Sequence, residues 1–124
     1  MKFILNGQIP SGKNAVMIVP KTGRHYPNKR FKLWRDEAWL QIREQVGTPK
    51  PIQSPCWVLV DYHPGDRRRR DVPGMMDALC NLMETANIVN DDSLFVDWHW
   101  TTFIVSDTPR VEIELLKKYV DTGK

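Results

Sequence analysis

The feature that most constrains the fold is a nearly continuous apolar run, C-W-V-L-V-D-Y, at Cys56–Tyr62. A short run with so little alternation between apolar and polar residues is typical of a strand that is buried on both faces. We therefore expect it to form the central strand of a sheet. The chain leaves this run through a polar loop, and loops that follow buried strands are frequent places for chemistry.

That loop opens the most distinctive stretch of the sequence, Asp66–Asp92, which reads D-R-R-R-R-D-V-P-G-M-M-D-A-L-C-N-L-M-E-T-A-N-I-V-N-D-D. Four consecutive arginines lead into Asp71, Asp77 lies on the helix-like segment that follows, and the pair Asp91–Asp92 closes the stretch. Arginines can hold phosphates, while carboxylates can hold Mg²⁺ against those phosphates. The combination indicates a metal-dependent nuclease.

Each part of this stretch also has a purely structural interpretation. The arginine run can be a solvated loop. Asp71 can be the N-cap of a helix that begins V-P-G, and the helix dipole favours an acid such as Asp77 in the first turns. Asp91–Asp92 can be a polar turn before a strand. Only the combination favours the nuclease over these alternatives.

The whole chain has 124 residues of ordinary composition, which predicts a single domain over residues 1–124. No apolar run is long enough to cross a membrane, and the N-terminus has too short an apolar run for a signal peptide. We therefore expect a cytoplasmic protein without a membrane partner. The two cysteines lie in apolar contexts and lack zinc-site spacing, so we expect both to be reduced core residues.

The distribution of charge is more informative than the net charge of +3. Residues 1–35 contain no acid and carry eight basic residues, which is the footprint of a phosphate-binding surface. The basic loop Lys21–Arg30 contains Tyr26, which suits either contact with nucleic acid or packing under an exposed loop. The turn G-Q-I-P-S-G-K-N at Gly7–Asn14 lacks the P-loop pattern, so we expect no nucleotide cofactor. The residues predicted to bind nucleic acid are Lys13, Asn14, Arg24, Lys29, Arg30, Arg67, Arg68, Arg69 and Arg70.

The hydrophobic periodicity predicts a mixed α/β domain, an α+β mixed sheet with two main helices, in the order β-β-α-β-α-β-β. In the last two strands, Trp98 and Trp100 should share one face and Asp97 and His99 the other, with the final strand antiparallel to its predecessor. The predicted helices are Phe31–Val46 and Pro73–Ala86, and the second has a polar strip of Asp77, Asn81 and Glu84. The predicted strands are Lys2–Asn6, Ala15–Val19, Cys56–Tyr62, Leu94–Val105 and one centred on Val111–Leu115.

The run R-R-R-R-D…D-A-L…A-N-I-V-N-D-D-S resembles the RusA family of Holliday junction resolvases, small endonucleases of bacteria, phages and prophages. That family typically has an arginine-containing loop, D-x-D-N-x-x-K, then D-A-L, and a D-D pair before a strand. The N-terminal elements are similar as well: a strand, a G-x-x-P-S-x-K-N turn and G-R-x-Y-P before the first helix. The resemblance spans most of the chain and keeps the order of the elements.

Carried over by position, Asp71 matches the first metal-binding aspartate of the family, and Asp92 matches the last, with Asp91 beside it. Two departures stand out. The second aspartate of the family falls at Pro73 and the following asparagine at Gly74, and the lysine falls at Asp77. We expect Asp77 to replace the missing carboxylate, and the positive charge of the lysine to come from elsewhere, such as Lys13.

The resemblance implies a Mg²⁺-dependent, structure-selective endodeoxyribonuclease, encoded by a bacterium or a phage, that resolves four-way junctions in DNA recombination and repair. It also implies a two-fold homodimer. The expected catalytic residues are Asp71, Asp77, Asp91 and Asp92, with Asp71, Asp77 and Asp92 as metal ligands. Two alternatives stay open: a nuclease for other branched DNA, and a catalytically impaired protein that binds junctions without cutting them.

Overall fold

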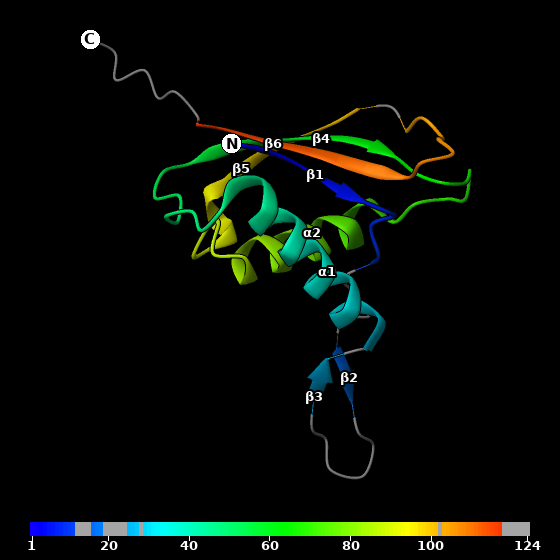
Figure 1. Ribbon diagram of the computed structural model, residues 1–124, viewed down its shortest axis with the longest axis horizontal. Coiled ribbons are helices and arrows are strands. Elements are labelled where there is room, and N and C mark those ends of the chain that lie inside the picture. The colour runs from blue at the N-terminus through cyan, green and yellow to red at the C-terminus, as the bar shows by residue number, and fades with distance from the viewer. Residues whose placement is uncertain (12–15, 19–24, 28, 102, 118–124) are drawn as a thin grey trace.

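The computed structural model describes residues 1–11, 16–18, 25–27, 29–101 and 103–117. Two helices lie on one side of a four-stranded sheet, and a two-stranded hairpin lies apart from that sheet (Figure 1). The elements are β1 Lys2–Asn6, β2 Val16–Ile18, β3 His25–Pro27, α1 Lys29–Val46, β4 Cys56–His63, α2 Val72–Thr85, the 3₁₀ helix η2 Asp92–Leu94, β5 Phe95–Trp100 and β6 Arg110–Lys117.

The main sheet is mixed and has the strand order β1-β6-β4-β5. β4 pairs with β5 in parallel, and β6 runs antiparallel to both β4 and β1. The predicted fold class and order of elements are therefore confirmed, with one addition. The expected basic loop contains the short strand β3, which pairs with β2. The last two strands run in opposite directions as expected, but they are not paired because β4 lies between them.

The central strand β4 is buried on one face only, which corrects the prediction of burial on both faces. Cys56, Val58, Val60 and Tyr62 are buried, whereas the alternating residues are partly or fully exposed. The reason is visible in Figure 1: both helices lie on the same side of the sheet, so the opposite side is left without a covering layer. That uncovered face exposes large apolar side chains, Ile4, Trp57 and Leu116.

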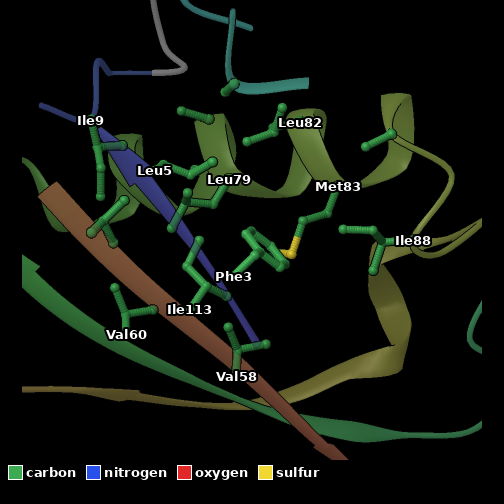
Figure 2. Close-up of a cluster of buried hydrophobic side chains, with 14 of the residues drawn as sticks. Phe3, Leu5, Ile9, Val58, Val60, Leu79, Leu82, Met83, Ile88 and Ile113 are labelled. Atoms are coloured by element: carbon green, nitrogen blue, oxygen red, sulfur yellow. The ribbon is translucent and has the colours of Figure 1, made fainter. Parts of the chain in front are cut away.

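The core lies between the sheet and the helices. Leu79, Leu82 and Met83 of α2 are fully buried. They meet apolar side chains that point from the strands, among them Phe3, Leu5, Val58, Val60 and Ile113 (Figure 2). This arrangement fixes α2 along the sheet, and it turns the opposite strip of α2 outward. Among the described residues, no helix is both long enough and apolar enough to cross a membrane. Both cysteines are free thiols, as expected.

The strand β5 is shorter than predicted and ends at Trp100. Its neighbour in the ladder is β4, and the chain stays beside β4 beyond Trp100: the Thr101 N–H donates to the Val60 main-chain oxygen at 3.0 Å, and Phe103 packs edge-on against Tyr62 with ring centres 5.6 Å apart. Trp98 and Trp100 stack with ring centres 6.2 Å apart, as their shared face predicts, and both pack against the core.

Candidate active site

The arginine run Arg67–Arg70 forms a loop that is anchored by one of its own members. The guanidinium of Arg70 donates to Asp66 Oδ1 at 2.6 Å and to Gln8 Oε1 at 2.9 Å, and its side chain is only 13% exposed. Asp66 also accepts from the backbone N–H of Arg68 at 3.0 Å, and this bond together with Arg70 lowers the pKa of Asp66. The other three side chains of the run are exposed. Arg70 therefore shapes the loop, and its neighbours project into solvent.

Asp71 is the N-cap of α2. Its Oδ1 accepts from the backbone N–H of Gly74 at 3.3 Å, and its Oδ2 accepts from Ser11 Oγ at 3.4 Å. The structural interpretation of Asp71 is thus confirmed, yet the residue remains exposed. It lies in the wall of a pocket of about 540 Å³ that is lined by Arg69, Arg70, Asp71, Val72 and Pro73. Because arginines and a carboxylate share this pocket, capping and a role at a phosphate are compatible.

Gly74 explains one departure from the family motif. A Cβ at this position would lie 2.2 Å from Ser11 Oγ and 2.6 Å from Asp71 Oδ2, both far inside normal contact distance. The absence of a side chain therefore lets Ser11 and Asp71 close over the first turn of α2. An asparagine here, as in the family motif, would displace both side chains.

The outward strip of α2 carries a concentration of acids. Asp77, Cys80 and Glu84 follow helical spacing along it, and Asp92 reaches it from the turn after the helix. Burial raises the pKa of the Cys80 thiol to about 12, with contributions from the charges of Asp92, Glu84 and Asp77. Burial also raises the pKa of Glu84, as do the charges of Asp92 and Asp91, and Glu84 shares a hydrogen bond with Asp92. The charges of Asp92 and Asp91 thus oppose ionisation of Glu84, which a bound cation would relieve.

The two acids of the Asp91–Asp92 pair have different local roles. Asp91 caps η2: its Oδ1 accepts from the backbone N–H of Ser93 at 2.9 Å, and this bond lowers the pKa of Asp91. Its main-chain oxygen accepts from Leu94 N–H at 3.2 Å. The polar-turn interpretation therefore describes Asp91, whereas the side chain of Asp92 contacts Glu84 and Cys80 on α2.

A cation from α1 reaches the same strip. The guanidinium Nη1 of Arg35 donates to Asn81 Oδ1 at 3.3 Å, and Asn81 lies between Asp77 and Glu84 on α2. The Nε of Arg35 is buried and has no hydrogen-bond partner among the described residues. Arg35 thus brings a positive charge to the polar strip of α2.

The structure brings only part of the predicted site together. Asp77 and Asp92 gather with Glu84 around Cys80, while Asp71 lies at the N-terminal end of the same helix. Within the described ranges, Asp71, Asp77 and Asp92 do not form a group whose ligand atoms all lie within 4.8 Å of one another. Their metal-binding roles remain predictions. Lys29 and Arg30 are exposed in the first turn of α1, and Lys13, Asn14 and Arg24 lie outside the described residues.

Sequence reasoning missed Glu84 and Arg35. Helical spacing does place Glu84 on the polar strip of α2, but the sequence does not show that the turn after the helix brings Asp92 back to it. Arg35 is part of the basic N-terminal third, and only the packing of α1 against α2 singles it out from the other cations.

Comparison with known proteins places this site in context. The family model described as Endodeoxyribonuclease RusA matches residues 8–116, a range that contains the arginine loop, α2 and the acidic turn. A curated relative from Aquifex aeolicus (strain VF5), Crossover junction endodeoxyribonuclease RusA, is 28% identical over 92 residues. The aligned region covers 74% of this chain and 72% of the relative.

Proposed function

Because the chain belongs to the RusA family of endodeoxyribonucleases, we propose that it resolves four-way DNA junctions by Mg²⁺-dependent hydrolysis of phosphodiester bonds. The curated relative is named for crossover junctions, which supports this choice of substrate. The observation that carries the proposal is the contact of Asp92 with Glu84 on the helix that Asp71 caps, directly after the arginine loop.

The carboxylates on α2 and in the turn after it have the chemistry that a hard divalent cation requires, although in the described residues the ligand atoms of Asp77, Glu84 and Asp92 do not all lie within 4.8 Å of one another. Mg²⁺ prefers oxygen ligands, and the carboxylates of Asp77, Glu84 and Asp92 supply them. When bound, the ion would polarise the phosphate and lower the pKa of the attacking water. Burial and the charges of Asp92 and Asp91 raise the pKa of Glu84, so a bound cation would favour the ionised form of Glu84.

The remaining residues would hold and orient the DNA. Arg67, Arg68 and Arg69 are exposed beside Asp71 and would bind backbone phosphates, which positions the substrate without reading its sequence. Arg70 would keep the loop in shape through Asp66. Arg35 would supply positive charge near the α2 strip, where charge develops on the phosphate during cleavage.

We further propose that the protein acts as a two-fold homodimer. A four-way junction has approximate two-fold symmetry and must be cut on two strands, so two identical sites related by a two-fold axis match it. Light scattering behind size exclusion, at the concentration used for cleavage, should give twice the chain mass. A monomer at that concentration would favour a simpler nuclease.

The catalytically impaired alternative is favoured by one specific observation. Pro73, in the first turn of α2, offers no carboxylate where the family motif has one. The variant Pro73→Asp restores that carboxylate. If Asp77 and Glu84 already replace it, wild type should cleave junctions and Pro73→Asp should change the rate little. If the wild type is inactive and Pro73→Asp cleaves, the natural protein is impaired.

A substrate panel tests the choice of substrate. Wild type should be incubated with Mg²⁺ and a four-way junction, a three-way junction, a flap and a linear duplex of the same sequences. We expect paired nicks at symmetric positions in the four-way junction and much slower cleavage of the others. Equal cleavage of the flap and the four-way junction would favour a nuclease for branched DNA in general.

A further inference from the structure

We propose that the uncovered face of the sheet carries a second metal site, for a divalent transition-metal ion such as Zn²⁺, built by Asp61, His63 and Glu112. Each residue offers one ligand atom, and these atoms all lie within 4.8 Å of one another. Asp61 and His63 are two residues apart on β4 and so share a face, and Glu112 on β6 is the direct cross-strand partner of Asp61. The site is separate from the acids of α2, because α2 packs on the opposite side of the sheet.

The distances already suit an ion. His63 Nε2 lies 3.1 Å from Asp61 Oδ1. Zinc ligands bond at about 2.0–2.2 Å, so two ligands at octahedral or tetrahedral angles are separated by about 3.0–3.4 Å. The carboxylate of Glu112 shares a hydrogen bond with Asp61, so it also lies close to this pair. An imidazole with two carboxylates also suits Zn²⁺ better than Mg²⁺, which prefers oxygen ligands alone.

The charges at this site favour a cation. Asp61 and Glu112 are directly opposite each other in an antiparallel pair, an arrangement that destabilises a sheet when both are charged. Within the described part of the chain, neither forms an ion pair with a lysine or arginine. Arg110, the cross-strand partner of His63, instead donates to Ser106 Oγ and to the Thr108 main-chain oxygen.

A hydrogen bond from Thr101 orients one of the proposed ligands, and a neighbouring cavity has room for water. Thr101 Oγ1 donates to Asp61 Oδ1 at 2.9 Å, which fixes the orientation of that carboxylate. A cavity of about 280 Å³ opens beside it, with walls that include Lys2, Asp61, His99, Thr101, Glu112 and Glu114. Waters in this cavity would complete the coordination.

A matched control lies on the same face of the sheet. His99 Nε2 is 3.3 Å from Asp97 Oδ2, so these two residues form the same kind of Asp–His pair on β5. No third acidic, histidine or cysteine ligand joins this pair in the described ranges. The two pairs therefore differ in the presence of Glu112, which is the ligand that turns an ion pair into a metal site.

The test is calorimetric titration of chelator-treated full-length protein with Zn²⁺ alone, with no DNA present. We expect one Zn²⁺ per chain in wild type and an affinity at least tenfold weaker in His63→Gln and in Glu112→Gln. Loss of a supporting hydrogen bond typically weakens metal binding about 10- to 100-fold, so Thr101→Val should bind at least tenfold more weakly. His99→Gln should bind as wild type does, and Asp92→Asn, which alters only the acids of α2 and the turn after it, should keep this site.

Circular dichroism of each metal-free variant checks that it is folded. His63→Gln alters β4 and Glu112→Gln alters β6, so if one variant does not fold, the other still tests the site. Wild-type protein also provides a measurement without mutation: Co²⁺ bound in this site should give visible absorption bands that Zn²⁺ abolishes. The proposal is overturned if wild type shows no saturable binding, if His63→Gln and Glu112→Gln bind as wild type does, or if Asp92→Asn removes the site instead.

Discussion

The two roles of Asp71 can be separated by comparing Asp71→Ala with Asp71→Asn. Asparagine is as good an N-cap as aspartate, and its Oδ1 can still accept from the Gly74 N–H that Asp71 binds at 3.3 Å. Alanine removes this acceptor and leaves the first turn of α2 uncapped, which costs about 1 kcal/mol. For a chain of this length, that corresponds to a decrease in Tm of about 3–6 °C. Asp71→Asn should melt within a degree or two of wild type.

Cleavage should separate the variants in a different way. If the carboxylate of Asp71 holds the metal or the phosphate, both variants should cut a four-way junction far more slowly than wild type, because neither retains the negative charge. Thermal unfolding and single-turnover cleavage of both variants, under the same buffer conditions, measure the two effects. Wild-type cleavage by Asp71→Asn would make Asp71 a cap alone, and an unchanged Tm for Asp71→Ala would refute the capping argument.

Three further predictions concern neighbouring residues. The pKa of Glu84 is raised in the folded protein, so its contribution to stability is complete below the ordinary pKa of 4.5 and is lost as the pH rises through the raised pKa. Glu84→Gln should remove this loss in the absence of metal. The plot of unfolding free energy against pH should then be flatter in that range than the wild-type plot. In Gly74→Ala, a gain in helix propensity of about 1 kcal/mol offsets a similar loss of capping, so the free energy of urea unfolding should change little. Cleavage should fall, because the new Cβ displaces the Asp71 carboxylate. Unchanged cleavage would contradict the close approach of Gly74 to Asp71. Arg69→Gln should reduce the salt dependence of junction binding by about one phosphate contact without affecting stability. Arg70→Gln should lower the free energy of unfolding, because it loses charged hydrogen bonds to Asp66.

The sequence predicts the helices and the order of the elements well, because their signals are local. The apolar stripe of α1 and the V-P-G start of α2 after Asp71 depend only on neighbours along the chain. The one-sided burial of β4 is different: whether a second layer covers a strand depends on where both helices pack, and an apolar run such as Cys56–Tyr62 does not record this. The short β3 was missed because three residues of strand carry little periodicity.

The same distinction applies to the sites. Asp71, Asp91 and Asp92 can be identified as candidate site residues from the sequence, because they belong to one contiguous motif. Glu84 and Arg35 belong to the site only through tertiary packing, which no local pattern encodes. The group on the uncovered face depends on strand register: Asp61 and His63 are close in sequence, but Glu112 joins them only because β6 pairs with β4 in one particular alignment.

Junction resolution is tested most directly by cleavage of a synthetic four-way junction, labelled in turn on each strand, by wild type and by Asp92→Asn. Each protein is measured with Mg²⁺ and with a chelator, and binding is followed by gel shift in parallel. We expect paired, symmetric nicks that require Mg²⁺ and are absent in Asp92→Asn, while binding persists in both proteins. Tight binding by wild type without nicks in any divalent metal, or equal cleavage by Asp92→Asn, would contradict this expectation.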